Sequence, residues 1–178
     1  MVQEEAPSKF EILKLLKHEL LNHADFTLAF VSSVGGKLQS ICCNQYGTIV
    51  ITDSFIARGL TENDAKSHLS VVMLLANILA GVTCFGIGFV ADKVSSYKIL
   101  TINNIFVSCV DLAMIAQVNS GLENLGPLFD VGLVLGIGFH TINFMLSLTI
   151  ISKLSNEQTR GSMFALNAVF GSMGILVI

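Results

Sequence analysis

Residues 69–91 form a stretch of 23 residues without a single charged side chain. A helix needs about 20 predominantly apolar residues to cross the hydrocarbon core of a bilayer. Backbone N–H and C=O groups inside lipid must be hydrogen-bonded within the segment, which favours a helix over an isolated strand. The sequence therefore predicts a transmembrane helix over Leu69–Ala91.

Four more segments of the chain have the same character. They are Phe26–Thr52, Ile99–Val118, Leu128–Ser152 and Gly161–Ile178. Over 178 residues the chain is 52% hydrophobic and only 13% charged, whereas soluble domains carry about 25% charged residues. We therefore predict an all-α, multi-pass membrane bundle of about five transmembrane helices over residues 25–178.

Residues 1–24 precede the first apolar segment and are predicted to be an amphipathic linker. Ser8 and Glu11 have capping-box spacing directly after Pro7. The apolar residues that would share one helical face are Ile12, Leu13, Leu16 and Leu20. This pattern favours either a helix lying on the membrane surface or a short soluble helix leading into the first span.

The basic residues are distributed unevenly over the two sides of the predicted bundle. One side carries Lys9, Lys14, Lys17, Lys93, Lys98, Lys153 and Arg160, and the other carries Arg58 and Lys66. Because Lys and Arg are enriched in cytoplasmic loops, the N-terminus is predicted to be cytoplasmic or on the equivalent organellar side.

The residue patterns that several classes of function require are absent from this sequence. There is no dense basic face for nucleic acid, no paired-carboxylate or nucleophile pattern, and no nucleotide-binding loop. Cys42, Cys43, Cys84 and Cys109 lie in apolar segments without metal-ligand spacing, where cysteine acts as a small apolar residue. We expect neither an enzyme nor a bound cofactor or metal.

Polar and small residues recur at helical spacing inside the predicted spans. The first span carries Ser33, Lys37, Ser40, Asn44 and Thr48. The fourth carries Gly132, Gly136, His140, Asn143 and Ser147, and the fifth carries Asn167 with Gly171 and Gly174. Small residues let helices approach closely, so packing accounts for most of these glycines.

Three ionisable residues at membrane depth need a separate explanation. Lys37, His140 and Asp111 each cost at least a few kcal/mol there, unless they face water, find a partner or stay neutral. For Lys37 and His140 we favour a water-filled pathway, lined further by the amides of Asn44, Asn143 and Asn167. For Asp111 the alternative is a neutral carboxyl that only holds helices together.

The stretch GFVADKVSSYK after the second predicted span resembles the loop signature of the major facilitator superfamily of secondary transporters. That signature is G-x-x-x-D-[RK]-x-G-x-[RK]-[RK], and the matching residues are Gly88, Asp92, Lys93 and Lys98. Ser95 and Tyr97 replace the usual Gly and a usual basic residue.

The stretch NEQTRGSMFALNAVFGSMGIL supports the resemblance, because it is similar to the start of the fifth helix of a transporter half. Its matching positions are Glu157, Arg160 and Gly161. The fourth and fifth spans lack the Arg and the Gly-Pro common in N-terminal halves. The resemblance thus implies helices seven to eleven of twelve, in a chain truncated at its C-terminus, with a five-helix N-terminal piece as the alternative.

This resemblance implies that the third span lies outside a cavity formed by the other four, so Asp111 is left out of the expected site. It also implies that Asp92 meets a helix N-terminus of the missing half. We expect a secondary transporter, or a fragment of one, that moves a small polar solute by alternating access, with a proton as a coupling partner. The alternative is a membrane scaffold that packs against another subunit without transporting.

Overall fold

The computed structural model describes residues 9–173, and these residues form helices joined by short turns, without a β-strand among them. The elements are α1 (Lys9–Asn22), α2 (Ala24–Ile41), the π-helical turn η1 (Cys42–Tyr46), α3 (Gly47–Ala57), α4 (Glu62–Ala91), α5 (Ser96–Asn119), the 3-10 turn η2 (Leu122–Asn124), α6 (Pro127–Leu154) and α7 (Glu157–Met173).

Four of these helices are long and apolar enough to cross a membrane. The first is the continuous rod of α2, η1 and α3 over Ala24–Ala57, and the others are α4, α5 and α6. They confirm four of the predicted spans, and each helix begins before its apolar segment, by one residue in α6 and by seven in α4. The second predicted span, Leu69–Ala91, extends back to Glu62.

The fifth predicted span remains a prediction. Its residues fall on α7, which begins earlier than expected, at Glu157, and has 17 described residues up to Met173. Residues 174–178, which include Gly174 of the expected stripe, lie outside the described part of the chain.

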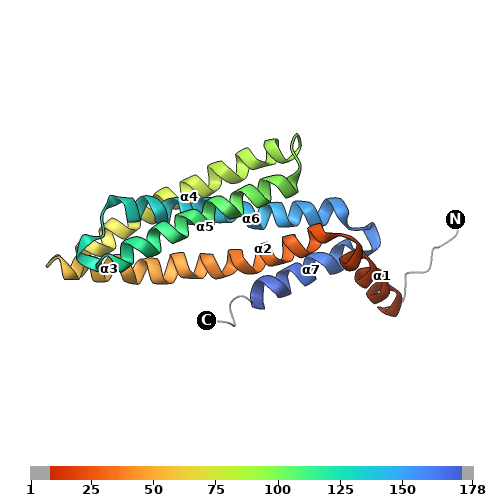
Figure 1. Cartoon of the computed structure of the whole chain (residues 1–178), viewed down its shortest axis with the longest axis horizontal. Helices are drawn as coiled ribbons and strands as arrows, with labels where there is room; N and C mark the ends of the chain where they lie inside the picture. The colour runs from red at the N-terminus through yellow and green to blue at the C-terminus, as the bar shows by residue number, and fades with distance from the viewer. Residues whose placement is uncertain (1–8, 174–178) are drawn as a thin grey trace.

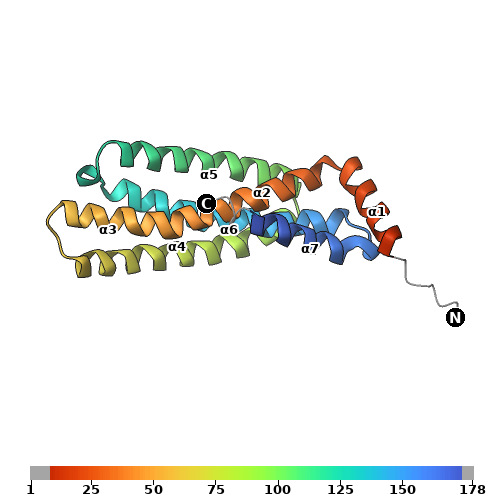
Figure 2. The ribbon, with the colours of Figure 1, turned by 90° about the horizontal axis from the view of Figure 1, so that it is seen from below.

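The long helices run alternately up and down along one axis, and α6 lies among the others (Figure 1). It packs against α2, α4, α5 and α7. The α4–α5 and α6–α7 connections lie at the same end as α1, which we call the α1 end (Figures 1 and 2). The opposite end holds the α3–α4 and α5–α6 connections, and we call it the α3–α4 end.

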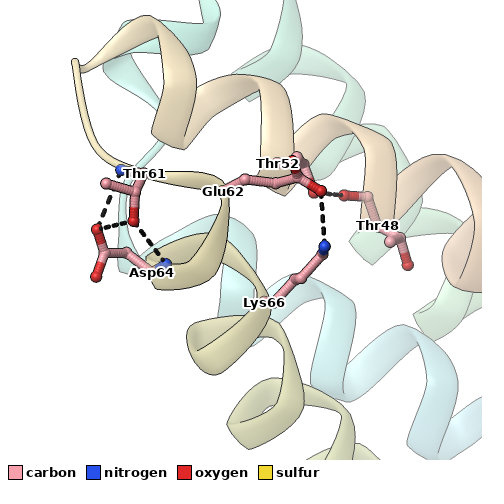
Figure 3. Close-up of polar contacts among 6 residues, drawn as sticks. All are labelled: Thr48, Thr52, Thr61, Glu62, Asp64 and Lys66. Atoms are coloured by element: carbon pink, nitrogen blue, oxygen red, sulfur yellow. Dashed lines mark hydrogen bonds and ion pairs between the residues drawn. The ribbon is translucent and has the colours of Figure 1, made fainter.

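The turn between α3 and α4 is set by a glycine and a cap. Gly59 adopts φ +77°, a conformation that favours glycine over residues with a side chain. Thr61 then caps α4: the Asp64 N–H donates to the Thr61 hydroxyl (3.2 Å), and the Thr61 N–H donates to the Asp64 carboxylate (3.0 Å; Figure 3). One turn further, Lys66 pairs with Glu62 at 2.7 Å.

Two apolar clusters hold the bundle together along its axis. The cluster at the α1 end includes the fully buried Phe26, Ile151 and Met163. The cluster toward the α3–α4 end includes Ile51 and Leu133. Between the two lies the middle of the bundle, where polar residues are concentrated.

Helix α1 lies at the end of the bundle at an angle to the long helices (Figures 1 and 2). The helix predicted in this part of the chain is present over Lys9–Asn22. Ser8 of its capping box lies outside the described residues. Leu20 packs against the apolar cluster at the α1 end. The Glu19 carboxylate accepts hydrogen bonds from the Thr159 hydroxyl (2.8 and 2.9 Å) and the Asn156 N–H (3.2 Å). This carboxylate therefore fixes α1 to the start of α7, where the helix dipole favours an anion.

Candidate functional site

A polar cavity of about 190 Å³ lies in the middle of the bundle, between the first span, α4 and α6. Its polar lining residues are Gln39, Ser40, Asn44, Asn77, His140 and Thr141. Ser40, Asn77 and His140 each lie at the midpoint of their span. The cavity is therefore at the depth where the hydrocarbon would otherwise exclude polar groups.

His140 enters this cavity because the facing residue of α2 is a glycine. A Cβ at Gly36 would lie 2.6 Å from the His140 Cε1, too close for any side chain unless the imidazole moves. The His140 Nδ1 is buried and has no hydrogen-bond partner in the described part of the chain. Because buried polar atoms are nearly always paired, this nitrogen is available to a bound molecule or water.

Asn44 lies in the π-helical turn η1, where the regular helix is interrupted. Its Nδ2 donates to the Ser40 carbonyl (2.7 Å) and contacts the Ser40 hydroxyl at 3.3 Å. Its own carbonyl accepts a hydrogen bond from the Thr48 hydroxyl (2.5 Å). Single π turns within α-helices are frequent at functional sites, and this one borders the cavity.

Lys37 lies one turn from the cavity without lining it. Its ammonium nitrogen is 5.7 Å from the centre of the Phe144 ring, a distance suited to a cation–π contact. Its stem packs beside Gly171 of α7, where a Cβ would lie in ordinary contact, 3.5 Å from the Lys37 Cγ. Among the described residues Lys37 makes no ion pair with a carboxylate.

Asn143 and Asn167, also predicted to line the site, lie in contacts between helices instead. The Asn143 Oδ1 accepts from the Asn103 Nδ2 at 2.6 Å and joins α6 to α5. The Asn167 Oδ1 accepts from the Ser33 hydroxyl at 2.7 Å and joins α7 to α2. The structure thus brings Asn44 and His140 together at the cavity and uses the other two amides in packing.

The cavity also has a hydrogen-bonded pair that sequence reasoning missed. The Gln39 Nε2 donates to both oxygens of the Asp111 carboxyl, at 2.9 and 3.0 Å. Gln39 lines the cavity, so Asp111, which was left out of the expected site, positions one of its walls. Gln39 is outside the stripe of Ser33, Lys37 and Ser40, and its partner is 72 residues away, so helical spacing gave no signal for the pair.

The residues of the GFVADKVSSYK stretch lie at the α1 end. Asp92 is the exposed C-cap of α4, and Lys93 follows it in the turn before α5, on which Lys98 lies. Gly88 has open space where a Cβ would be, so no other helix of the described chain approaches it closely. The end of α4 is instead held by the Lys153 ammonium of α6, which donates to the Ala91 carbonyl (3.0 Å).

Glu157 and Arg160 lie in the first turn of α7. Glu157 is exposed, while Arg160 is half-buried, and its Nε has no hydrogen-bond partner in the described residues. The carboxylate bound at the start of α7 is that of Glu19, which lies outside the stretch that resembles the transporter family.

Comparison with known proteins identifies no relative: no family model, no curated protein and no solved structure matches the chain. Over residues 9–173, no group of three or more His, Cys, Asp or Glu side chains is placed to hold a metal ion.

Proposed function

We propose that the chain is a secondary transporter, or part of one, that moves a small polar solute through the cavity containing His140. The observation that carries this proposal is the position of the cavity at the midpoint of three spans. Secondary transporters bind their substrates near the bilayer midplane, where interrupted helices provide polar groups. The π-helical turn Cys42–Tyr46 is such an interruption.

In this proposal His140 is the central binding residue. Its unpartnered Nδ1 hydrogen-bonds the solute or carries a coupling proton, and the Asn44 and Gln39 amides complete the polar wall. Lys37 attracts an anionic or hydroxylated group from the neighbouring turn. Asn143 and Asn167 contribute by holding α5 and α7 in place.

Membership of the major facilitator superfamily is part of the same proposal and rests on the GFVADKVSSYK and Glu157–Arg160 stretches. The grouping of both stretches at the α1 end supports it, because the family has them on one membrane side (Figure 1). A chain of this kind would work with a second transporter half.

The test is uptake into proteoliposomes, measured over a panel of radiolabelled amino acids, sugars and carboxylic acids. We expect His140→Ala to reduce uptake at least tenfold. Thr149→Val is the matched control on α6, because within residues 9–173 the Thr149 hydroxyl bonds only the Met145 carbonyl of its own helix (2.9 Å). Equal uptake by His140→Ala and the unmodified protein, at a level above that of empty liposomes, would refute the site.

A non-transporting scaffold is the second candidate, and the exposed face of α4 is the surface on which its partner would pack. Phe85, Phe89 and Val82 are each more than 60% exposed there, so a partner helix has room to pack. A cysteine-labelling experiment separates the transporter from the scaffold. The native cysteines are replaced by alanine, and a single cysteine is introduced at Ser40. Labelling by impermeant thiol reagents from either membrane side favours the transporter, and labelling from one side only favours the scaffold.

A further inference from the structure

A second polar cavity, of about 130 Å³, lies at the α3–α4 end of the bundle. It is enclosed by the end of α3, the first turns of α4 and the start of α6. Its polar side chains are Ser54, Arg58, His68 and Asp130. Asp130 and His140 are ten residues apart on α6, or about 15 Å along the helix, so this cavity is separate from the central one.

One pair of side chains closes the wall of this cavity between α4 and α6. The His68 Nε2 and the Asp130 Oδ2 are 2.9 Å apart. The imidazole also packs on Phe55, with the two ring centres 5.0 Å apart. Among the residues that line the cavity, only Asp130 is acidic, and one of its carboxylate oxygens is already in hydrogen-bond contact with His68.

Arg58 is an exposed residue that lines the cavity, and two contacts orient its guanidinium. Its Nε donates to the Ser54 carbonyl (3.2 Å), and its central carbon lies 4.6 Å from the centre of the Phe55 ring. These two contacts orient the planar group and leave its terminal nitrogens without a carboxylate partner among the described residues. An oriented guanidinium of this kind matches the two oxygens of a carboxylate.

The nearby carboxylates in the α3–α4 turn are engaged elsewhere. Asp64 caps α4 through Thr61, and Glu62 pairs with Lys66 (Figure 3). The positive charge of Arg58 is therefore not neutralised from within its own turn.

Two further features of the cavity favour a bound anion. The Ser54 side chain is 2% exposed, and its hydroxyl has no hydrogen-bond partner within the described chain. A buried hydroxyl without a partner is unfavourable, and an acceptor oxygen in the cavity would satisfy it. The start of α6 also lines the cavity, at Gly126 and Pro127, and no side chain caps it. The positive end of its dipole favours negative charge, of which the Asp130 carboxylate in the same first turn supplies part.

We propose that this cavity binds a small monocarboxylate anion of about the size of acetate. The carboxylate accepts hydrogen bonds from the Arg58 guanidinium and the Ser54 hydroxyl and faces the N-terminus of α6. A volume of about 130 Å³ accommodates such an anion. The proposal goes beyond the proposed transport through the central cavity and holds whether or not the chain transports.

Equilibrium binding of radiolabelled acetate to the full chain tests the proposal. The chain is placed in phosphatidylcholine nanodiscs, which contain no anionic lipid, at constant ionic strength set by sodium chloride. We expect saturable acetate binding that Arg58→Gln weakens at least tenfold, as expected for loss of a charge-assisted hydrogen bond. Lys66→Gln is the matched control, because it removes a cation at the same end that does not line the cavity.

Ser54→Ala distinguishes a binding role from a structural one. Removing an unpartnered hydroxyl should leave the midpoint of thermal unfolding unchanged or raised, while acetate binding weakens about fivefold. Absent or unsaturable acetate binding, or an equal loss of binding in Lys66→Gln, would overturn the proposal. His140→Ala should bind acetate normally, so failure of the transport proposal and failure of this one give different results.

Discussion

Helices α6 and α4 have similar lengths and pack against each other, yet they occupy different environments. Half of the most apolar stretch of α6 is buried within the described chain, compared with 11% of that of α4. The buried residues of α6 include Asn143 and Ser147. In a membrane the outward-facing apolar residues of α4 contact lipid at no cost, so apolarity alone does not identify the core. The comparison shows that burial depends on where a helix lies in the bundle, because small residues of α4 such as Gly81 and Gly88 are exposed and have no neighbour in the described chain against which to pack.

The largest effect that tests this comparison comes from truncating one leucine in each helix. Leu146 of α6 is 1% exposed, whereas Leu74 of α4 is 59% exposed. Leu146→Ala should lower the free energy of unfolding by about 2–5 kcal/mol, because it leaves a cavity. Leu74→Ala should change it by less than about 0.5 kcal/mol. Unfolding by sodium dodecyl sulphate in bicelles, followed by circular dichroism, measures both, and equal losses would contradict the assignment of α4 to the periphery.

Replacing a glycine by alanine should change the free energy of unfolding in opposite directions in the two helices. A Cβ at Gly138 of α6 would lie 2.7 Å from the Leu79 Cγ, so Gly138→Ala should destabilise by about 1–3 kcal/mol. A Cβ at Gly81 of α4 would meet nothing within 4 Å, and Gly81→Ala should stabilise by up to about 1 kcal/mol through helix propensity. The same unfolding measurement applies. A destabilising Gly81→Ala would reveal a neighbour on the outer face of α4, such as another subunit.

The contact between α5 and α6 depends on a pair of asparagines. The Asn103 Nδ2 donates to the Asn143 Oδ1 (2.6 Å) and to the Phe139 carbonyl (3.0 Å). Asn103→Ala should cost about 1 kcal/mol, the size of an interhelical hydrogen bond in model membrane helices. A double-mutant cycle with Asn143→Ala should give a coupling energy of similar size, and a coupling energy of zero would show that the pair does not join the helices.

The smallest expected effect concerns a hydrogen bond between α4 and α6 themselves. The Thr83 hydroxyl lies 3.1 Å from the Gly138 carbonyl but also 2.8 Å from the Leu79 carbonyl of its own helix. Thr83→Val keeps the shape and should cost only about 0.6 kcal/mol. The free energy of unfolding again provides the measurement. A loss above about 2 kcal/mol would mean that α4 is held mainly by polar contacts.

The four long helices were predictable because their length and lack of charge leave few alternatives. Their boundaries were less predictable, since polar caps such as Thr61 with Asp64 extend a helix beyond its apolar part. The candidate site was predicted only in part. Helical spacing identified Asn44 and His140, but it gives no information on which helix faces which, so it placed Asn143 and Asn167 at the same site.

The pairing of Gln39 with Asp111 was out of reach of the sequence for a related reason. It depends on α5 packing directly against α2, and no local sequence pattern indicates that contact. The cavity at the α3–α4 end was also missed, because Arg58, His68 and Asp130 come from three separate loops or helix starts. Each of these residues alone resembles an ordinary loop residue.

The π-helical turn Cys42–Tyr46 sets the rotational phase between the two halves of the first span. An α-helix turns by about 100° per residue, so one residue more or less in this turn changes the direction of everything after it. Upstream, α2 directs Ser33 and Gly36 toward α7 and α6. Downstream, α3 carries Ser54 and Arg58 to the cavity at the α3–α4 end. A single-residue deletion here would therefore leave the membrane-spanning length almost unchanged while rotating Ser54 and Arg58 out of alignment with α4 and α6.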